Sequence, residues 1–546
     1  MRLPPLLELL TTEKLTALSD LSRAMGDLAT FESKASTEGH GILFDERSVT
    51  YYSAWSKAPL SRHTNTMESS AASSFDFRAP IRPRAPGCPI PLTTIQRLTW
   101  NRLVGTGNPV STRLCASAIR IRGLLDVELL QRCLEEMIRR HDSLRTRIVV
   151  TDGTPQHYIE TDRNYRLNLI DMSDQPGSGA DSQVKTLVQE FIDRRIDLSK
   201  DPFFEARLWK LSDQEHVLVL MIHHIISDGI SNGILARELW TLYEQASEGK
   251  PFSLPPLPIQ FADYAVWHQQ AHDAWLLTHS DYWKQHLQGS RRVEIPVDNG
   301  CEPTEDAIGI TTHIPFGDVL SAALRDIARR ERSLLSLVVM AGYAIVMMRW
   351  CRQDDILIEL MSHGRHRRPE LNNVIGFLAN GIICRVAVGH NDTFHGLLNR
   401  VQAEFSASLA HEDLNRIPEF IPECYTEASF NWQPTAWAGG RLDHHVFPEF
   451  GTLIGRELSH CQRQGTAFQD SCRLLIEPFP ARSPTPLKFC PVFFDSGNSI
   501  HLIVSYQPRC LSSNVMDSFG RSLLSVLEQI TISPSIRIAA LTDHMC

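Results

Sequence analysis

The chain has 546 residues, of which 42% are hydrophobic and 21% charged, and its formal net charge is −9. This length and composition are those of a globular protein with two to four domains. The longest apolar runs fall short of the roughly 20 residues of a membrane span, so no transmembrane helix is expected. The negative charge disfavours nucleic-acid binding, which requires a concentrated basic face.

The twelve cysteines are scattered along the chain and form no CxxC pair. A zinc site or a disulfide framework requires more regular spacing, so we expect reduced thiols in a cytoplasmic protein. The first residues, MRLPPLLELLTTEKLTALSDL, contain one arginine and no long apolar core followed by a small-residue cleavage site. We therefore expect no export signal.

Residues 1–58 form the first expected unit. A leucine pattern predicts a helix near residues 5–32, and the segments ILF and VTYY around DERS predict a β-hairpin within residues 41–55. Residues 59–90 are rich in Ser, Thr and Pro, which is typical of a linker. A unit this small has little core of its own. It either docks on the main body, receives a partner, or is a partly disordered extension.

From residue 91 onward, strand and helix patterns alternate in mixed order. Apolar spacing predicts helices at residues 124–144 and 231–246 and within 324–350, and strands at 216–224 and 499–507. A charge-mixed stretch at residues 289–309 indicates a boundary between two halves. The expected fold is therefore α/β or α+β, with an N-terminal lobe at residues 91–285 and a C-terminal lobe at 286–546.

The most informative segment is VLVLMIHHIISDG, residues 217–229, in which an apolar strand ends on two histidines. Successive side chains on a strand point to opposite faces, so His223 and His224 cannot both face one cavity. A metal site built from both histidines and Asp228 is disfavoured for the same reason. Gly229 can adopt a positive φ and allow a substrate close to the backbone, and Ser231 is expected to cap the next helix.

A neutral imidazole at the end of a strand can take a proton from an amine or hydroxyl nucleophile, because its pKa lies near 6.5. Asp228 could orient that imidazole, or it could form a buried ion pair that holds the loop. A second histidine pair, in DHHVF at residues 443–447, lacks these surroundings. The complete arrangement of strand, two histidines, Asp-Gly and helix is therefore more specific than the two histidines alone.

HHIISDG is similar to the HHxxxDG motif of the condensation domains of nonribosomal peptide synthetases. Further segments resemble that family in order and spacing: PLTTIQRLTW (91–100), RRHDSLRTRI (139–148), RRIDLSKDPFFEARLWKL (194–211), FADYAVWHQQ (261–270) and GRHRRPELNNVIGFLANGIICR (364–385). The resemblance extends from about residue 88 to the C-terminus.

The resemblance implies two chloramphenicol-acetyltransferase-like lobes in a V-shaped pseudo-dimer, with the histidine loop in a tunnel between them. It implies that His224 is catalytic, as a base or as the group that positions the acceptor. His223 and Asp228 would be mainly structural, and Gly229 would line the site near the thioester carbonyl. The supporting residues implied are Arg365, as the partner of Asp228, together with Asn380 and Arg385.

The family's substrates arrive on the 4′-phosphopantetheine arms of carrier proteins, so no cofactor or metal bound by this chain is expected. An acyl or peptidyl carrier protein is the implied partner, and a small molecule or a second carrier supplies the acceptor. The N-terminal unit resembles a β-hairpin docking domain, which would capture a carrier tail by strand addition. If the chain is complete, it would act as a free-standing enzyme.

Two positions depart from the family pattern. Gly381 stands where the family has a threonine, and Leu378 stands where it has an aromatic residue, which leaves the chemistry around Asn380 open. The segment HEDLNRIPEF (411–420) lacks the family's proline and phenylalanine at their usual places, a change that could alter a partner surface.

The leading hypothesis is transfer of an acyl chain from a carrier thioester to an amine or hydroxyl, in nonribosomal peptide or hybrid polyketide synthesis. Three alternatives remain: an epimerase, a non-catalytic recruiting platform, and a relative that uses coenzyme A donors. The segment DGISNGIL favours condensation over epimerisation, because epimerases usually carry a tryptophan just after this element.

Overall fold

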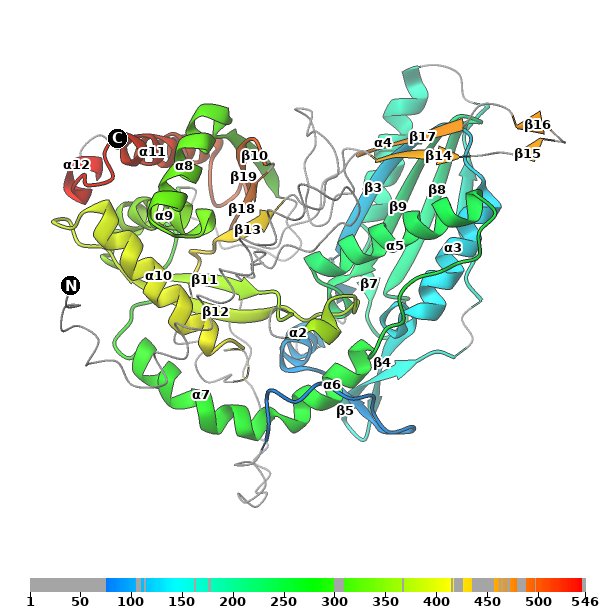
Figure 1. Cartoon of the computed structure of the whole chain (residues 1–546), viewed down its shortest axis with the longest axis horizontal. Helices are drawn as coiled ribbons and strands as arrows, with labels where there is room; N and C mark the ends of the chain where they lie inside the picture. The colour runs from blue at the N-terminus through cyan, green and yellow to red at the C-terminus, as the bar shows by residue number, and fades with distance from the viewer. Residues whose placement is uncertain are drawn as a thin grey trace, which may run out of the picture. The chain divides into compact units, whose positions relative to one another are not determined.

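The computed structural model describes most of the chain from residue 75 to residue 542 (Figure 1). The described range has gaps at residues 105–109, 112–113, 162–163, 175–177, 299–308, 366–367, 414–415, 417–425, 435–455, 461–462, 465–466, 469–471, 479–487 and 496. The expected N-terminal helix and hairpin, and the first part of the expected linker, lie outside the described residues.

A six-stranded sheet has the strand order β14-β17-β3-β9-β8-β6. Its strands are β3 (Leu114–Arg122), β6 (Asn168–Asp171), β8 (Phe204–Ser212), β9 (Glu215–His223), β14 (Arg456–His460) and β17 (Cys472–Pro478). Strand β17 comes from late in the chain and pairs antiparallel with β3, so distant segments share this sheet. The central strand β9 is buried from His216 to His223, which explains its almost continuous apolar sequence.

Helices cover this sheet. They are α3 (Val127–Arg140), α4 (Ser178–Ile192) and α5 (Gly229–Ser247), and Figure 1 shows α3 and α5 crossing the near face of the sheet. Asp126 caps α3, because its carboxylate accepts the amide of Leu129. Apolar residues three or four positions apart then form the buried face of α3.

Smaller elements complete the N-terminal half. They are β1 (Ile90–Pro91), α2 (Thr94–Val104), β2 (Val110–Ser111), β4 (Thr146–Thr151), β5 (Thr154–Ile159), β7 (Ile196–Asp197), α6 (Phe261–Gln270) and α7 (His272–Leu287). Strands β1, β5 and β4 form one small sheet, and β2 pairs with β7.

Residues 75–90, within the expected linker, make specific contacts with both halves. Arg84 pairs with Asp263 of α6 at 3.0 Å, and the ring of Phe75 lies 6.0 Å from that of Trp267. The backbone amide of Ile81 donates to Glu370, in the loop between β11 and β12 of the C-terminal half, at 3.0 Å. This segment therefore links α6 to the loop around residue 370.

The C-terminal half contains a second sheet covered by helices. Its elements are β10 (Ile310–Pro315), α8 (Gly317–Arg330), α9 (Leu335–Cys351), β11 (Asp355–Ser362), β12 (Asn380–Ala387), α10 (Phe394–Ala410), β13 (Asn431–Pro434), β18 (Phe489–Asp495), β19 (Ile500–Tyr506), α11 (Ser513–Ile532) and α12 (Ile538–Thr542). Strands β15 (Arg463–Gln464) and β16 (Ala467–Phe468) come between β14 and β17 in the chain, pair with each other and lie on the side of the six-stranded sheet (Figure 1). Strands β10, β19, β18 and β13 pair in that order, and β11 pairs with β12. An isolated bridge between Glu359 and Ser429 joins the two sets.

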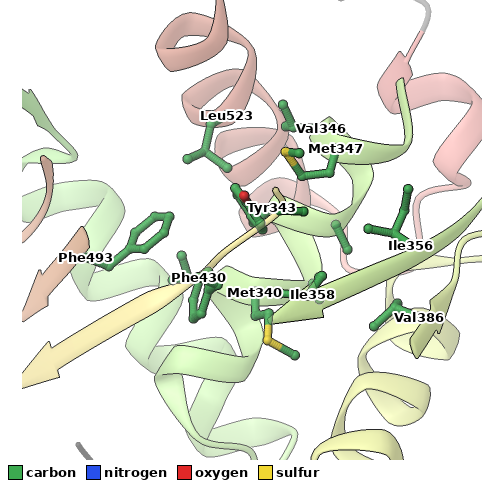
Figure 2. Close-up of a cluster of buried hydrophobic side chains, with 14 of the residues drawn as sticks. Met340, Tyr343, Val346, Met347, Ile356, Ile358, Val386, Phe430, Phe493 and Leu523 are labelled. Atoms are coloured by element: carbon green, nitrogen blue, oxygen red, sulfur yellow. The ribbon is translucent and has the colours of Figure 1, made fainter. Parts of the chain in front are cut away.

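Helix α9 lies at the centre of this half, and every residue from Leu337 to Met348 is buried. It packs between α8, α10 and α11, so it needs no polar face. A Cβ on Gly342 would lie 2.6 Å from Leu527, which shows how closely α9 and α11 approach. Figure 2 shows Met340 and Tyr343 of α9 packed with Ile358 of β11.

Among the described helices, none alone is long and apolar enough to cross a bilayer. Helices α8 and α9 meet that criterion only when they are taken together, and they are bent by 108° with respect to each other.

The predicted elements agree with the structure to within a few residues. The helix expected at residues 124–144 is α3, which ends at Arg140 and continues as a short 3₁₀ turn. The strand expected at 216–224 is β9, and it ends one residue earlier, at His223. The strand expected at 499–507 is β19.

Candidate active site

The histidine loop begins where β9 ends. His223 is the last residue of β9, and its amide donates to the carbonyl of Phe203 at 2.7 Å. The Nδ1 atom of its fully buried ring accepts the amide of Ile225 at 3.0 Å, so that nitrogen carries no proton. The His223 side chain therefore contributes a hydrogen bond to the turn that follows β9.

His224 is the first residue of a 3₁₀ turn, His224–Ile226, between β9 and α5. Its side chain is 6% exposed, and its ring centroid lies 4.9 Å from that of Phe377, which belongs to the C-terminal half. The ring of His223 instead lies 5.8 Å from that of Phe203, so the two histidines have different neighbours.

Gln96 of α2 fixes the same turn from a third element. Its amide nitrogen donates to the carbonyl of Ile225 at 2.6 Å, and its amide oxygen accepts the backbone amide of Thr93 at 3.0 Å. Gln96 is fully buried, so these bonds replace contacts with water. The motifs in the sequence assign no role to Gln96. A glutamine among the apolar residues of a buried helix nevertheless indicates a side chain that makes specific hydrogen bonds.

The ion pair predicted between Asp228 and Arg365 is present. Arg365 binds the carboxylate with both terminal nitrogens, at 2.7 and 3.1 Å, and both side chains are 2% exposed. Burial acts to raise the pKa of Asp228, but Arg365 and hydrogen bonds from Ser231 outweigh it and hold the pKa below its usual value. Asp228 is therefore ionised.

Asp228, rather than Ser231, is the N-cap of α5, so the expected cap assignment is wrong. The carboxylate of Asp228 accepts the backbone amide of Ser231 at 2.8 Å. Ser231 occupies the N3 position of a capping box, and its hydroxyl accepts the backbone amide of Asp228 at 3.3 Å. Asp228 stands just before the first helical residue and can accept a free amide of the first turn, whereas Ser231 already lies within that turn.

The segment around Gly376 connects the C-terminal half to this cap. The hydroxyl of Ser231 accepts the amide of Gly376 at 3.0 Å, and the carboxylate of Asp228 accepts the amide of Leu378 at 3.1 Å. Ser143 donates to the carbonyl of Ile375 at 2.5 Å. A Cβ on Gly376 would lie 2.0 Å from the ring of Phe261, so only glycine permits this approach.

Two glycines near the site behave differently. Gly364, next to Arg365, has a φ of +70°, and a Cβ there would lie 2.1 Å from the carbonyl oxygen of Leu378. Gly229 is the first helical residue of α5 and does not adopt the positive φ that the sequence suggested. The conformational freedom of glycine is therefore required at residue 364 rather than at 229.

Asn380 and Arg385, the two supporting residues expected from the segment at 364–385, lie in different places. Asn380 begins β12, is 9% exposed and pairs in register with Ser362, close to the loop of Arg365. Arg385 lies further along β12 and pairs with Asp355 at 2.7 Å. Arg385 therefore supports the edge of the sheet, and the structure does not bring it to His224.

A second buried network lies behind the site. Glu238 of α5 accepts from Arg140 at 2.9 Å and lies 2.8 Å from the ring nitrogen of His141. Burial acts to raise the pKa of Glu238, but His141 and Arg140 outweigh it and lower the pKa. These bonds fix α5 against α3. Among the described residues, no group of three histidine, cysteine or acidic side chains is placed to hold a metal ion.

Comparison with known proteins gives consistent relatives. A family model described as "Condensation domain" matches residues 89–416. One of the linear gramicidin synthase proteins from Brevibacillus parabrevis is 32% identical over 386 residues, which are 69% of this chain and 7% of that protein. The chain thus spans a small part of the length of this relative.

Solved structures share the fold at low sequence identity. The X-domain from teicoplanin biosynthesis gives a TM-score of 0.70 at 21% identity, over 84% of this chain and 99% of that one, and 0.67 in its complex with OxyB. The first condensation domain of the calcium-dependent antibiotic synthetase gives 0.64 at 16% identity, over 83% and 99% of the two chains.

These neighbours confirm the expected α/β fold of chloramphenicol-acetyltransferase type. The family model covers more than half of the chain and includes the histidine loop, Asp228 and Arg365. The motifs, the buried pair that joins the two halves and these matches lead to one conclusion: the chain belongs to the condensation-domain family of nonribosomal peptide synthetases.

Proposed function

We propose that this protein transfers an acyl chain from a phosphopantetheine thioester on a carrier protein to an amine or hydroxyl acceptor. The observation that supports this most directly is the separation of roles in the histidine loop. His223 and Asp228 are occupied by structural hydrogen bonds, while His224 begins the turn between β9 and α5. His224 is therefore our candidate catalytic residue.

In this proposal, His224 takes the proton of the acceptor nitrogen or oxygen as that atom attacks the thioester carbonyl. A C–N or C–O bond forms, the C–S bond breaks, and the proton passes from His224 to the departing thiolate. No external oxidant or cofactor is needed for this balance. Gly229, at the start of α5, is proposed to lie beside the thioester carbonyl.

Asp228 is not available as the base in this scheme. Each of its two oxygens accepts a hydrogen bond from Arg365, and Ser231 and Leu378 supply further donors. A carboxylate so fully satisfied has a lowered pKa and a weak tendency to accept a proton. Its proposed role is to lock the loop that presents His224.

We propose that the donor arrives on an acyl or peptidyl carrier protein, with the N-terminal unit at residues 1–58 as a docking element. We also place the reaction in the cytoplasm. Six cysteines among the described residues are free thiols, which fits a reducing compartment: Cys88, Cys133, Cys351, Cys384, Cys490 and Cys510.

Intact-protein mass spectrometry of an acyl-loaded carrier, mixed with candidate amines and alcohols, tests the proposal. Wild type should remove the acyl mass and form an amide or ester, and His224→Ala should lower that rate at least about 100-fold. Glu128→Gln, on the exposed start of α3, is the matched control and should react at the wild-type rate. Equal rates for wild type and His224→Ala would overturn the role of His224.

A second candidate is a non-catalytic recruiting domain. It is favoured by the TM-score of 0.70 with the X-domain, a domain whose structure is also known in complex with OxyB. On this hypothesis, the acyl mass on the carrier stays constant with wild type and variant alike, and the protein binds another enzyme of the assembly line. The same mass-spectrometry experiment therefore separates the two candidates.

A further inference from the structure

Building on the proposed transferase activity, we infer that Glu359, Ser429 and Asn431 form a substrate subsite. Its ligand is a basic nitrogen, a primary amine or a guanidine, carried on an aliphatic chain of the substrate. Glu359 lies on β11, Asn431 begins β13, and Ser429 comes two residues before it. All three lie outside the segments that resemble the family's motifs.

The alternation of side chains along the strands places these residues on one face. Ile358 and Leu360 flank Glu359 on β11, so the alternation of side chains along the strand points Glu359 to the face opposite theirs. Figure 2 shows Ile358 and Phe430 on the core side. Phe430 lies between Ser429 and Asn431, which therefore share the face of Glu359.

Backbone pairing brings the two strands together at this point. Glu359 forms a parallel bridge with Ser429, in which its amide donates to the carbonyl of Ala428 at 2.9 Å. The amide of Phe430 donates back to the carbonyl of Glu359 at 3.2 Å. Adjacent strands lie about 4.8 Å apart, so the side chains of Glu359 and Ser429 are immediate neighbours.

The hydrogen-bonding capacity of this group is unmet within the described part of the chain. Ser429 is 1% exposed and Asn431 is fully buried, yet the Ser429 hydroxyl and both polar atoms of the Asn431 amide have no hydrogen-bond partner there. Native structures rarely leave such groups unsatisfied, so each one requires an explanation. A bound polar group would satisfy them.

Glu359 adds an acid for which the described residues supply no cation. Its carboxyl is surrounded by protein atoms, and burial alone raises its pKa well above the usual value, since no charged group described in the structure offsets it. The residue nevertheless keeps some exposed surface, which allows contact with a ligand.

Other buried acids in this protein have cations. Asp228 pairs with Arg365, Glu238 with Arg140, and Asp413 with Arg416. Near Glu359, a ligand would have to supply the positive charge. A basic nitrogen fits best, because it can donate to the Glu359 carboxylate, the Ser429 hydroxyl and the Asn431 amide oxygen together.

The residues around the subsite indicate what kind of chain carries the basic nitrogen and how far the subsite lies from the loop of Arg365. Asn431 pairs in register with Val492, which belongs to an apolar cluster with Cys490, Phe494 and Ile503 on the same sheet. This cluster can pack against an aliphatic chain. Strand β11 ends three residues after Glu359, at Ser362, a rise of about 10 Å, and Arg365 follows in the loop that pairs with Asp228.

The test compares binding of 1-pentylamine and 1-pentanol, two chains that differ in the basic group, by ligand-observed NMR on the full-length protein. Wild type should bind pentylamine, and Glu359→Gln should weaken that binding at least tenfold without weakening pentanol binding. Ser429→Ala should weaken pentylamine binding about threefold. Glu128→Gln, on the exposed start of α3, should bind pentylamine as wild type does.

Equal binding of pentylamine to wild type and Glu359→Gln would overturn the inference, as would equal binding of amine and alcohol to wild type. The carrier assay separates this result from the proposed function. If Glu359→Gln weakens amine binding and the carrier assay shows no transfer with wild type, the subsite stands and the transferase proposal fails. If transfer proceeds while Glu359→Gln leaves amine binding intact, the transferase proposal stands and the subsite fails.

Discussion

Two buried carboxyl groups in this protein have opposite surroundings. Asp228, at the start of α5, accepts hydrogen bonds from Arg365, Ser231 and Leu378, and its pKa is lowered. Glu359, on β11, has burial as the single influence on its pKa, which is raised. Burial penalises both charged forms, so the difference comes from the partners. The Asp228 carboxylate forms an ion pair that links the two halves, and the Glu359 carboxyl remains available to a ligand.

The largest expected effect on stability comes from removing the charge of Asp228 while Arg365 stays in place. Asp228→Asn keeps a side chain that can cap α5 but leaves Arg365 buried without its counter-charge. Loss of one partner of a buried pair typically costs about 3–5 kcal/mol. Urea unfolding should show this loss as a lower midpoint with an unchanged slope.

Adding Arg365→Met to Asp228→Asn should recover part of that stability, because the uncompensated charge is then removed. Glu359→Gln should cause no comparable loss, since Glu359 has no charged partner among the described residues to leave behind. If Asp228→Asn unfolded at the wild-type urea midpoint, the conclusion that the Asp228–Arg365 pair stabilises the fold would be wrong.

A smaller effect is expected at Gly364, which positions Arg365 for Asp228. Gly364→Ala places a Cβ at a φ of +70°, 2.1 Å from the carbonyl oxygen of Leu378. The positive φ alone costs about 1–2 kcal/mol, and relief of the clash adds to it. Thermal unfolding should show a clear decrease in Tm.

Gly153→Ala is the matched control for that variant. Gly153 has a φ of +75°, but nothing lies within 4 Å of the Cβ position, so the variant carries the backbone cost alone. If Gly364→Ala and Gly153→Ala lowered the Tm equally, the close approach of the Arg365 loop to Leu378 would be unimportant for stability.

The smallest effect expected is in pH dependence, and it has opposite signs for the two carboxyls. The pKa of Asp228 is lowered, so its contribution is present above its unfolded pKa of about 3.9 and is lost as the pH falls through the folded value. The pKa of Glu359 is raised, so the folded state holds its proton longer. Stability therefore falls as the pH rises from the unfolded pKa, about 4.3, toward the folded value.

Glu359→Gln removes the second of these effects. Relative to wild type, the variant should gain stability as the pH rises from about 4.3, the unfolded pKa of Glu359, into the neutral range. Paired thermal melts across that range measure the difference. A constant difference in Tm between the two proteins at every pH would show that Glu359 titrates as an ordinary exposed glutamate does.

Most of the local structure could be predicted from sequence because the signals are local. The apolar spacing of residues 124–144 predicts α3, and the continuous apolar run before His223 predicts a buried strand. The HHxxxDG motif and its ordered companions identified the family and proposed the pairing of Asp228 with Arg365, which the structure confirms. The motif also drew attention to His224.

Other parts of the site were mispredicted or missed. Ser231 was expected to cap α5, but the choice between two neighbouring caps depends on which side chain reaches the free amides in three dimensions. Gln96 was missed because its partner, Ile225, lies 129 residues away in the chain. Arg385 was grouped with the site by its motif, but its place on β12 directs it to Asp355.

By itself, the sequence determined the family, the main helices and strands, and the residues of the histidine loop, because periodicity and motif spacing are properties of adjacent residues. Only the tertiary structure decided which carboxyl is satisfied and which is not. That distinction depends on long-range neighbours: Arg365 follows Asp228 by 137 positions, and Ser429 follows Glu359 by 70. The pKa of a buried group is set by those neighbours, which no local pattern encodes.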